Sequence, residues 1–103
     1  PDLQLYKPRP ALIVQSNKNN ERLTNLIFLQ ITSNLSNKDE DTQLFIKLDS
    51  AAWRSSCLST DSVVKAEMIC TLPKVFVYKK LGSLSPHVMQ DVNLCIQNSL
   101  SLK

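Results

Sequence analysis

The chain has 103 residues, of which 43% are hydrophobic and 20% charged. This composition excludes a disordered chain and predicts one globular domain over residues 1–103. The formal net charge of +3 favours a polyanionic partner only mildly. No apolar stretch approaches the roughly 20 residues that cross a bilayer, and no leader is recognisable, so we expect no membrane association.

The cysteines Cys57, Cys70 and Cys95 are odd in number and lack CxxC spacing. This pattern predicts free thiols in a reducing compartment, and therefore a cytoplasmic protein. Metal ligation is disfavoured because His87 is the only histidine and has no partner at a ligand spacing. Gly82 is the only glycine, which excludes the glycine-rich loops of nucleotide enzymes. We expect neither a metal nor a cofactor.

Apolar runs rich in β-forming residues predict about five short strands. In chain order they are Ala11–Ser16, Thr24–Ser33, Thr42–Asp49, Ser62–Leu72 and Val75–Gly82, the last ending in a tight turn at Gly82. Between them we expect a polar turn at 17–22, a charged loop at 34–41 and a connector at 50–61. Trp53, in the connector, could stack on a base, but a core position is favoured.

A helix is predicted to begin after Ser85. Ser85 can cap it, and Pro86 suits the first helical position. Apolar residues then recur at spacings of three and four, which forms one stripe for packing on a sheet. They are Val88, Met89, Val92, Cys95, Ile96 and Leu100, with Ser99 among them.

The polar loops between the strands are too short for parallel crossovers, so antiparallel pairing is expected. The predicted fold class is therefore mainly β with a C-terminal helix, in the form of a small, strongly bent antiparallel barrel that the helix caps.

The stretch "KPRPALIV" places Arg9 between Pro8 and Pro10. Proline fixes its own φ and restricts the residue before it, so the backbone of Arg9 has little freedom. Two interpretations stay open. The prolines could merely begin a strand beside a surface arginine, or they could hold a functional cation in place.

Four segments, in order, resemble the MazF/PemK family of toxin endoribonucleases. They are "PRPALIVQSN", "LIFLQITSN", "DSVVKAEMICTL" and "LGSLSPHVMQDVNLCIQNSL". The resemblance implies an SH3-like barrel, a homodimer, and metal-independent cleavage of single-stranded RNA. It also implies a cognate antitoxin whose extended tail covers the substrate groove. The family usually opens with a further strand, whereas only "PDLQLY" precedes Lys7, so the resemblance implies a shortened or missing first strand, or a fragment.

The resemblance assigns catalytic roles to Arg9 and Thr32. It implies RNA contacts for Lys7, Ser33 and Met68, and Met68 stands where the family often has a glutamine. This substitution would remove a polar contact from the groove.

The residues are compatible with RNA cleavage, because RNA supplies its own nucleophile, the 2′-hydroxyl. With one histidine, a two-histidine mechanism is impossible. Arg9 could stabilise the developing negative charge through its guanidinium fork, and Thr32 could donate a hydrogen bond to a phosphoryl oxygen. Asp61 and Glu67 are the nearest candidates for a general base.

Two other functions remain open at this point. The first is a non-catalytic relative that acts by binding protein, either as a decayed toxin that still binds antitoxin or as a gyrase poison like the CcdB toxins. The second is an SH3-like adaptor for proline-rich peptides. It is disfavoured because the chain has few aromatic residues to line a groove.

Overall fold

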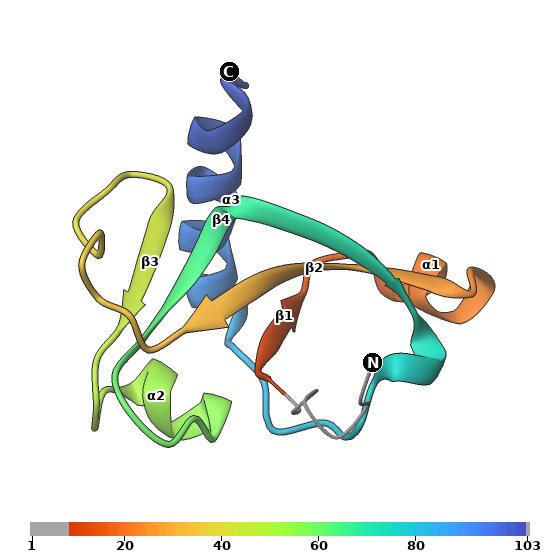
Figure 1. Ribbon diagram of the computed structural model, residues 1–103, viewed down its shortest axis with the longest axis horizontal. Coiled ribbons are helices and arrows are strands. Elements are labelled where there is room, and N and C mark those ends of the chain that lie inside the picture. The colour runs from red at the N-terminus through yellow and green to blue at the C-terminus, as the bar shows by residue number, and fades with distance from the viewer. Residues whose placement is uncertain (1–8, 103) are drawn as a thin grey trace, which may run out of the picture.

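The computed structural model describes residues 9–102, which contain one curled antiparallel sheet. Its strands are β1 (Ala11–Ile13), β2 (Asn25–Thr32), β3 (Gln43–Ile46) and β4 (Ser62–Pro73). They are arranged in the order β1-β2-β4-β3, and each neighbouring pair is antiparallel (Figure 1). The antiparallel pairing is as predicted.

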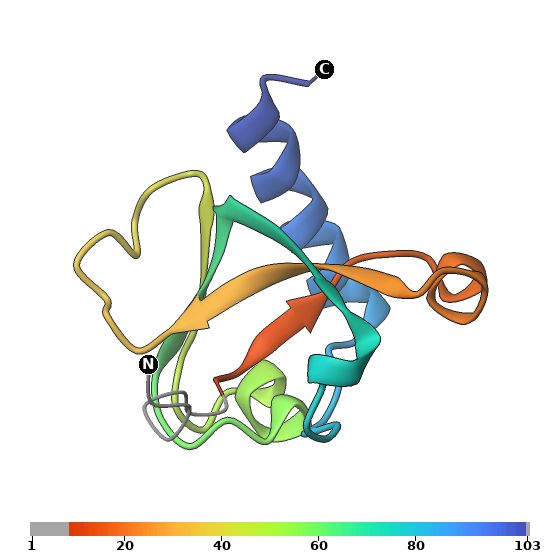
Figure 2. The ribbon, with the colours of Figure 1, turned by 45° about the vertical axis from the view of Figure 1, so that its right-hand side comes forward.

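The sheet bends because β4 is long and its pairing with β2 is interrupted. Leu29 lies opposite Ile69, but the next residue, Gln30, lies opposite Lys65. Such an irregularity bends a strand and increases its twist. Figure 2 shows β4 arching over β2 and β1 as a result. The predicted class, mainly β with a bent antiparallel sheet and a C-terminal helix, is confirmed.

The C-terminal helix α3 (Pro86–Leu100) packs against β3 and β4 as predicted. Ser85 caps it, since its hydroxyl oxygen accepts the Val88 N–H at 3.3 Å. The shared core contains fully or almost fully buried side chains from both layers: Leu29, Ile46, Val64, Ala66, Val92 and Cys95. The apolar stripe read from the sequence therefore faces the sheet.

The strand predicted at Val75–Gly82 is wrong. After Pro73 the chain forms a 3₁₀ turn, η2 (Lys74–Phe76), and then irregular backbone. Pro73 pairs with Asn25, the first residue of β2. Because β2 does not extend before Asn25, a longer β4 would have no partner there. The Lys74 N–H donates instead to the Thr24 carbonyl at 2.8 Å. The apolar run is consequently exposed, with Val75 at 86%.

Two segments predicted as a turn and a connector contain short helices. These are α1 (Asn17–Arg22) and α2 (Ala51–Ser56). Neither has an apolar stripe of useful length, so their start depends on caps. Ser16 and Ser50 provide these caps by accepting the backbone N–H three residues later. Trp53 packs against the core, as favoured from the sequence.

The predicted tight turn at Gly82 is also wrong, because residues 77–85 are irregular backbone without a turn, and Gly82 does not have a positive φ. It is required for close approach: an added Cβ would lie 2.4 Å from the carbonyl oxygen of Ser55. Ser83 fixes this contact by donating its N–H to the same oxygen at 3.0 Å. The segment before α3 is thereby attached to the end of α2.

All three cysteines are free thiols, as predicted. Among residues 9–102, no helix combines the length and the apolar character that crossing a membrane requires. The expectation about a first strand concerns residues outside the described part of the chain.

Candidate active site

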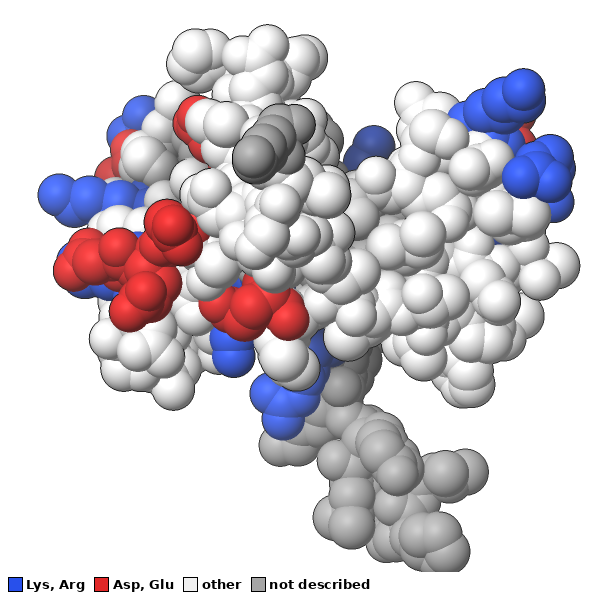
Figure 3. Space-filling model, turned by 90° about the horizontal axis from the view of Figure 1, so that it is seen from above, with Lys and Arg blue, Asp and Glu red and all other residues white. Residues whose placement is uncertain are grey.

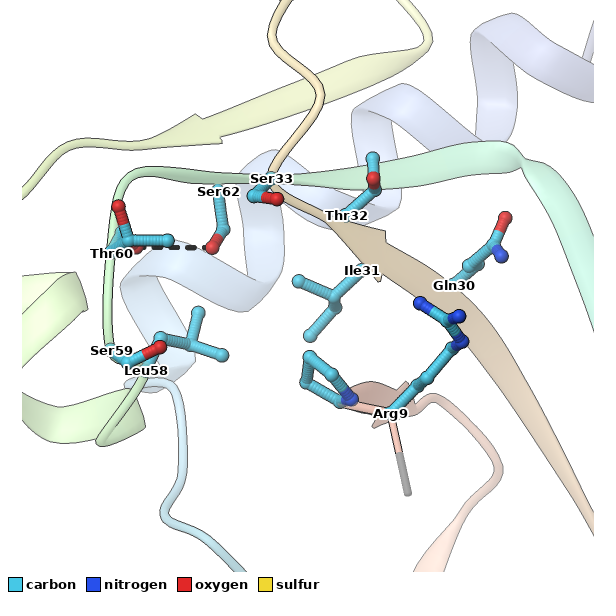
Figure 4. A pocket seen from close by; sticks show the side chains of 10 residues that line it. Arg9, Gln30, Ile31, Thr32, Ser33, Leu58, Ser59, Thr60 and Ser62 are labelled. Carbon is cyan, nitrogen blue, oxygen red and sulfur yellow. Dashed lines mark hydrogen bonds between the residues drawn. The ribbon is translucent and has the colours of Figure 1, made fainter. Parts of the chain in front are cut away.

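A pocket of about 210 Å³ opens where β2 ends and β1 begins (Figure 4). Its walls come from three separate stretches of sequence. They are Arg9 and Pro10, then Gln30 to Ser33, and then Leu58 to Thr60 with Ser62.

The backbone beside Arg9 is tied to the sheet. The Pro10 carbonyl accepts the Ile31 N–H at 3.4 Å, and Ala11, the next residue, pairs with Gln30. Figure 4 shows the Arg9 guanidinium extending toward the Gln30 side chain. Pro10 also limits the φ and ψ of Arg9. The sheet and the proline together therefore fix where this cation emerges.

Thr32, the last residue of β2, has a hydroxyl group that already accepts one hydrogen bond. Its Oγ1 accepts the Asn34 N–H at 3.1 Å, which closes a tight turn after the strand. A hydroxyl that accepts one bond still has a proton to donate. Thr32 can therefore serve as a donor to an anion in the pocket, and Ser33 beside it lines the same wall.

The opposite wall is a run of hydroxyl residues that we did not predict as part of the site. Ser59, Thr60 and Ser62 lie on the segment that leads into β4. The Ser62 hydroxyl donates to the Thr60 carbonyl at 3.0 Å, which holds this turn (Figure 4). The only signal in the sequence is the density of hydroxyls in "LSTDS", which has no specific meaning without the fold.

Gln30 was likewise not predicted as a site residue, although its position in the sequence indicates it. It precedes Thr32 by two residues on one strand, so both side chains leave the same face of the sheet. The pocket thus contains an amide beside the arginine and the hydroxyls.

The charge of the pocket is positive. Arg9 is the only charged side chain among the described residues that line it, and it is exposed. Within residues 9–102 the one ion pair joins Lys38 to Asp39, so no described carboxylate neutralises Arg9. A cation surrounded by hydroxyl donors suits a phosphate group.

The structure brings three of the predicted site residues together, namely Arg9, Thr32 and Ser33. Lys7 lies outside the described residues. Met68 lies on β4, with 41% of its surface exposed, and does not line this pocket. Its RNA contact stays a prediction for a different part of the surface.

Neither candidate general base lines the pocket. The Glu67 carboxylate accepts hydrogen bonds from the Thr42 hydroxyl and from the Gln43 amide, at 3.0 Å for the latter. Asp61 accepts the Leu48 N–H. Both carboxylates are thus directed toward the β3 side of the sheet, where they have structural partners.

Known proteins resemble this chain in sequence and in fold. The family model described as PemK-like, MazF-like toxin of type II toxin–antitoxin system matches residues 4–100. The Endoribonuclease MazF of Staphylococcus saprophyticus is 31% identical over 94 residues, which is 91% of this chain and 74% of that protein.

Two solved structures superpose over most of the chain. The Mycobacterium tuberculosis toxin MazF-mt6 has a TM-score of 0.79 at 22% identity, covering 92% of this chain and 88% of that one. A mycobacterial endoribonuclease in complex with its cognate antitoxin has a TM-score of 0.77 at 25% identity, covering 99% and 88%. From the family match and the bacterial relative, the chain belongs to the PemK-like, MazF-like toxin family of type II toxin–antitoxin systems.

Proposed function

We propose that this protein is the toxin of a toxin–antitoxin pair and that it acts as an endoribonuclease on single-stranded RNA, using the pocket at Arg9. The observation that supports this most directly is the lining itself, one arginine with the hydroxyls of Thr32, Ser33 and the 59–62 turn. The 31% identical relative is named an endoribonuclease, which agrees with this activity.

In the proposed reaction the RNA 2′-oxygen attacks the adjacent phosphorus. The 2′-hydroxyl loses its proton, the P–O5′ bond breaks, and the 5′-oxygen gains a proton. The products are a cyclic phosphate and a 5′-hydroxyl. Negative charge builds on the non-bridging oxygens as the phosphorus becomes five-coordinate, and stabilising that charge is often the largest catalytic contribution.

Arg9 supplies that stabilisation in the proposal. Its planar guanidinium can donate two parallel hydrogen bonds to a phosphate, and it stays protonated at all ordinary pH values. Thr32 donates a further hydrogen bond with the proton that its Asn34 contact leaves free. Because Arg9 already provides the positive charge, we propose that cleavage does not require a divalent cation.

The proposal includes a cognate antitoxin and a homodimer, and places the protein in the cytoplasm, where its free thiols would stay reduced. One solved structural neighbour is in complex with its own antitoxin.

The segment after β4 exposes large apolar side chains, including 86% of Val75, 68% of Phe76 and 77% of Tyr78. Contiguous apolar surface of this kind is typical of protein interfaces. Light scattering coupled to size exclusion gives the mass in solution.

The test is incubation of purified protein with a long single-stranded RNA in EDTA, beside its Arg9→Ala and Lys38→Ala variants. Lys38 is the matched control, since it is paired with Asp39 away from the pocket. We expect cleavage by the wild type and by Lys38→Ala, and a loss of at least about 100-fold for Arg9→Ala. Equal cleavage by Arg9→Ala would refute the role of Arg9. Intact RNA in every lane would refute the nuclease and favour a relative that acts by binding protein.

A further inference from the structure

We propose that Lys65, on β4, is a substrate-binding residue that contacts the RNA phosphate next to the one that reacts. This inference rests on the proposed nuclease function. It follows from the register of the sheet, from the face on which Lys65 lies and from the charges around it.

The register places Lys65 beside the pocket. Gln30, which lines the pocket, is the direct cross-strand partner of Lys65. Directly opposite residues in an antiparallel pair send their side chains to the same side, with Cβ atoms about 5 Å apart. Lys65 is thus the next side chain across the sheet from Gln30.

The face is the one turned away from α3, although Val63 and Gln43, which share this face with Lys65, are themselves buried. Val64 and Ala66, the neighbours of Lys65 in sequence, are both buried in the core. Since side chains alternate along a strand, Lys65 leaves the opposite face, with Gln30 and Thr32. Arg9 precedes Ala11, the cross-strand partner of Gln30, by two residues, and its guanidinium extends toward the Gln30 side chain (Figure 4). The guanidinium of Arg9 and the side chains of Gln30 and Lys65 thus follow one another as a polar row across the lines of β1, β2 and β4.

The dimensions of the polar row suit a nucleic-acid backbone. Neighbouring strands lie about 4.8 Å apart, so the β4 backbone at Lys65 is about 10 Å from the line of β1. Two cations separated by an amide over this distance can bind phosphates that flank one another, with Gln30 facing the sugar or base between them. The flexible stem of lysine gives it reach as a point charge for phosphate.

The charge of Lys65 is not used for folding within the described residues. Its side chain forms no ion pair or hydrogen bond inside residues 9–102. Glu67, the carboxylate nearest along β4, is held by Thr42 and Gln43. Lys65 is half-buried, so part of its surface reaches solvent.

The carboxylates near β3 indicate where the RNA path across the sheet ends. The loop before β3 carries Asp39, Glu40 and Asp41, and with Glu67 it makes that side of the molecule acidic. Figure 3 shows most of the visible acidic side chains gathered on this side, with some basic ones beside them, and further basic side chains at the opposite end, over α1. Lys38 also lies on this side, over the Phe45 ring, but it is paired with Asp39 at 3.2 Å. These carboxylates disfavour a polyanion beyond Lys65, so we expect the RNA path from Arg9 to end there.

The experiment measures binding of a fluorescein-labelled, fully 2′-O-methylated oligonucleotide of mixed sequence, which lacks the nucleophile and stays intact. Affinity is followed against KCl concentration for the wild type, Lys65→Met and Lys38→Met. Methionine keeps most of the aliphatic stem and removes the charge. If circular dichroism shows that Lys65→Met unfolds at a lower temperature than the wild type, Lys65→Gln is measured in its place. Lys65→Arg, which retains the charge, is measured as a further control.

We expect Lys65→Met to lower the slope of log affinity against log salt by about 0.7, the value for one phosphate contact on a single strand. Lys38→Met and Lys65→Arg should keep the wild-type slope. In cleavage assays Lys65→Met should raise KM and leave kcat nearly unchanged, unlike Arg9→Ala. A wild-type slope for Lys65→Met, with cleavage and its dependence on Arg9 intact, would overturn the role of Lys65 alone. No oligonucleotide binding and no RNA cleavage by the wild type would overturn this inference together with the nuclease.

Discussion

Replacement of Thr32 by valine tests the chemistry of the pocket with little change of shape. The substitution exchanges a hydroxyl for a methyl group on a half-buried β-branched side chain at the end of β2. Two interactions are lost. One is the bond in which Oγ1 accepts the Asn34 N–H at 3.1 Å, and the other is the proposed donation to the phosphoryl oxygen.

The two losses have different magnitudes. Asn34 is exposed, so water can replace the lost partner of its N–H, and we expect a destabilisation of at most about 1 kcal/mol. The loss of one preorganised donor to a transition-state oxyanion costs about 10²- to 10³-fold in kcat. Thr32→Val should therefore remain folded at room temperature and cleave RNA at least about 100-fold more slowly.

The assay combines urea unfolding with single-turnover cleavage of RNA in EDTA. Thr32→Ser is the matched variant because it keeps the hydroxyl, and it should retain most of the activity. The reasoning is refuted if Thr32→Val cleaves within a few-fold of the wild type. It is equally refuted if Thr32→Ser and Thr32→Val lose the same activity, because the hydroxyl would then not be the group that matters.

Two further predictions concern the fold. Gly82→Ala should lower the free energy of unfolding by about 1–3 kcal/mol, because its Cβ would lie 2.4 Å and 2.7 Å from the carbonyl oxygens of Ser55 and Ser56. An unchanged urea midpoint would contradict this contact. Burial, and then the charges of Asp91, Asp41 and Glu67, raise the pKa of the Cys95 thiol. The raised pKa of Cys95 contributes to the free energy of unfolding. This contribution is full below the unfolded pKa of about 8.5 and is lost as pH rises through the higher folded pKa. Wild-type stability should therefore fall more steeply than that of Cys95→Ala above that pH, and parallel curves would show that Cys95 keeps an ordinary pKa.

Local sequence was sufficient for the elements whose signal is strong over many residues. The β2 and β4 runs are long and apolar, and α3 combines a serine cap, a proline at its start and a regular apolar stripe. Ordered motifs also identified the family and two residues, Arg9 and Thr32, that the structure brings into one pocket. These features depend on residues near one another in the chain, so a single sequence can show them.

The remaining features depend on contacts between distant residues, and only the tertiary structure decided them. Whether Val75 to Gly82 continued as a strand depended on where β2 began, some fifty residues earlier in the sequence. The hydroxyl wall at 59–62 joined the site because the turn into β4 passes the end of β2. Glu67 turned away from the pocket to its partners beside β3. The irregular pairing after Leu29 set Lys65 opposite Gln30, because register is a property of two strands and is not written in either one.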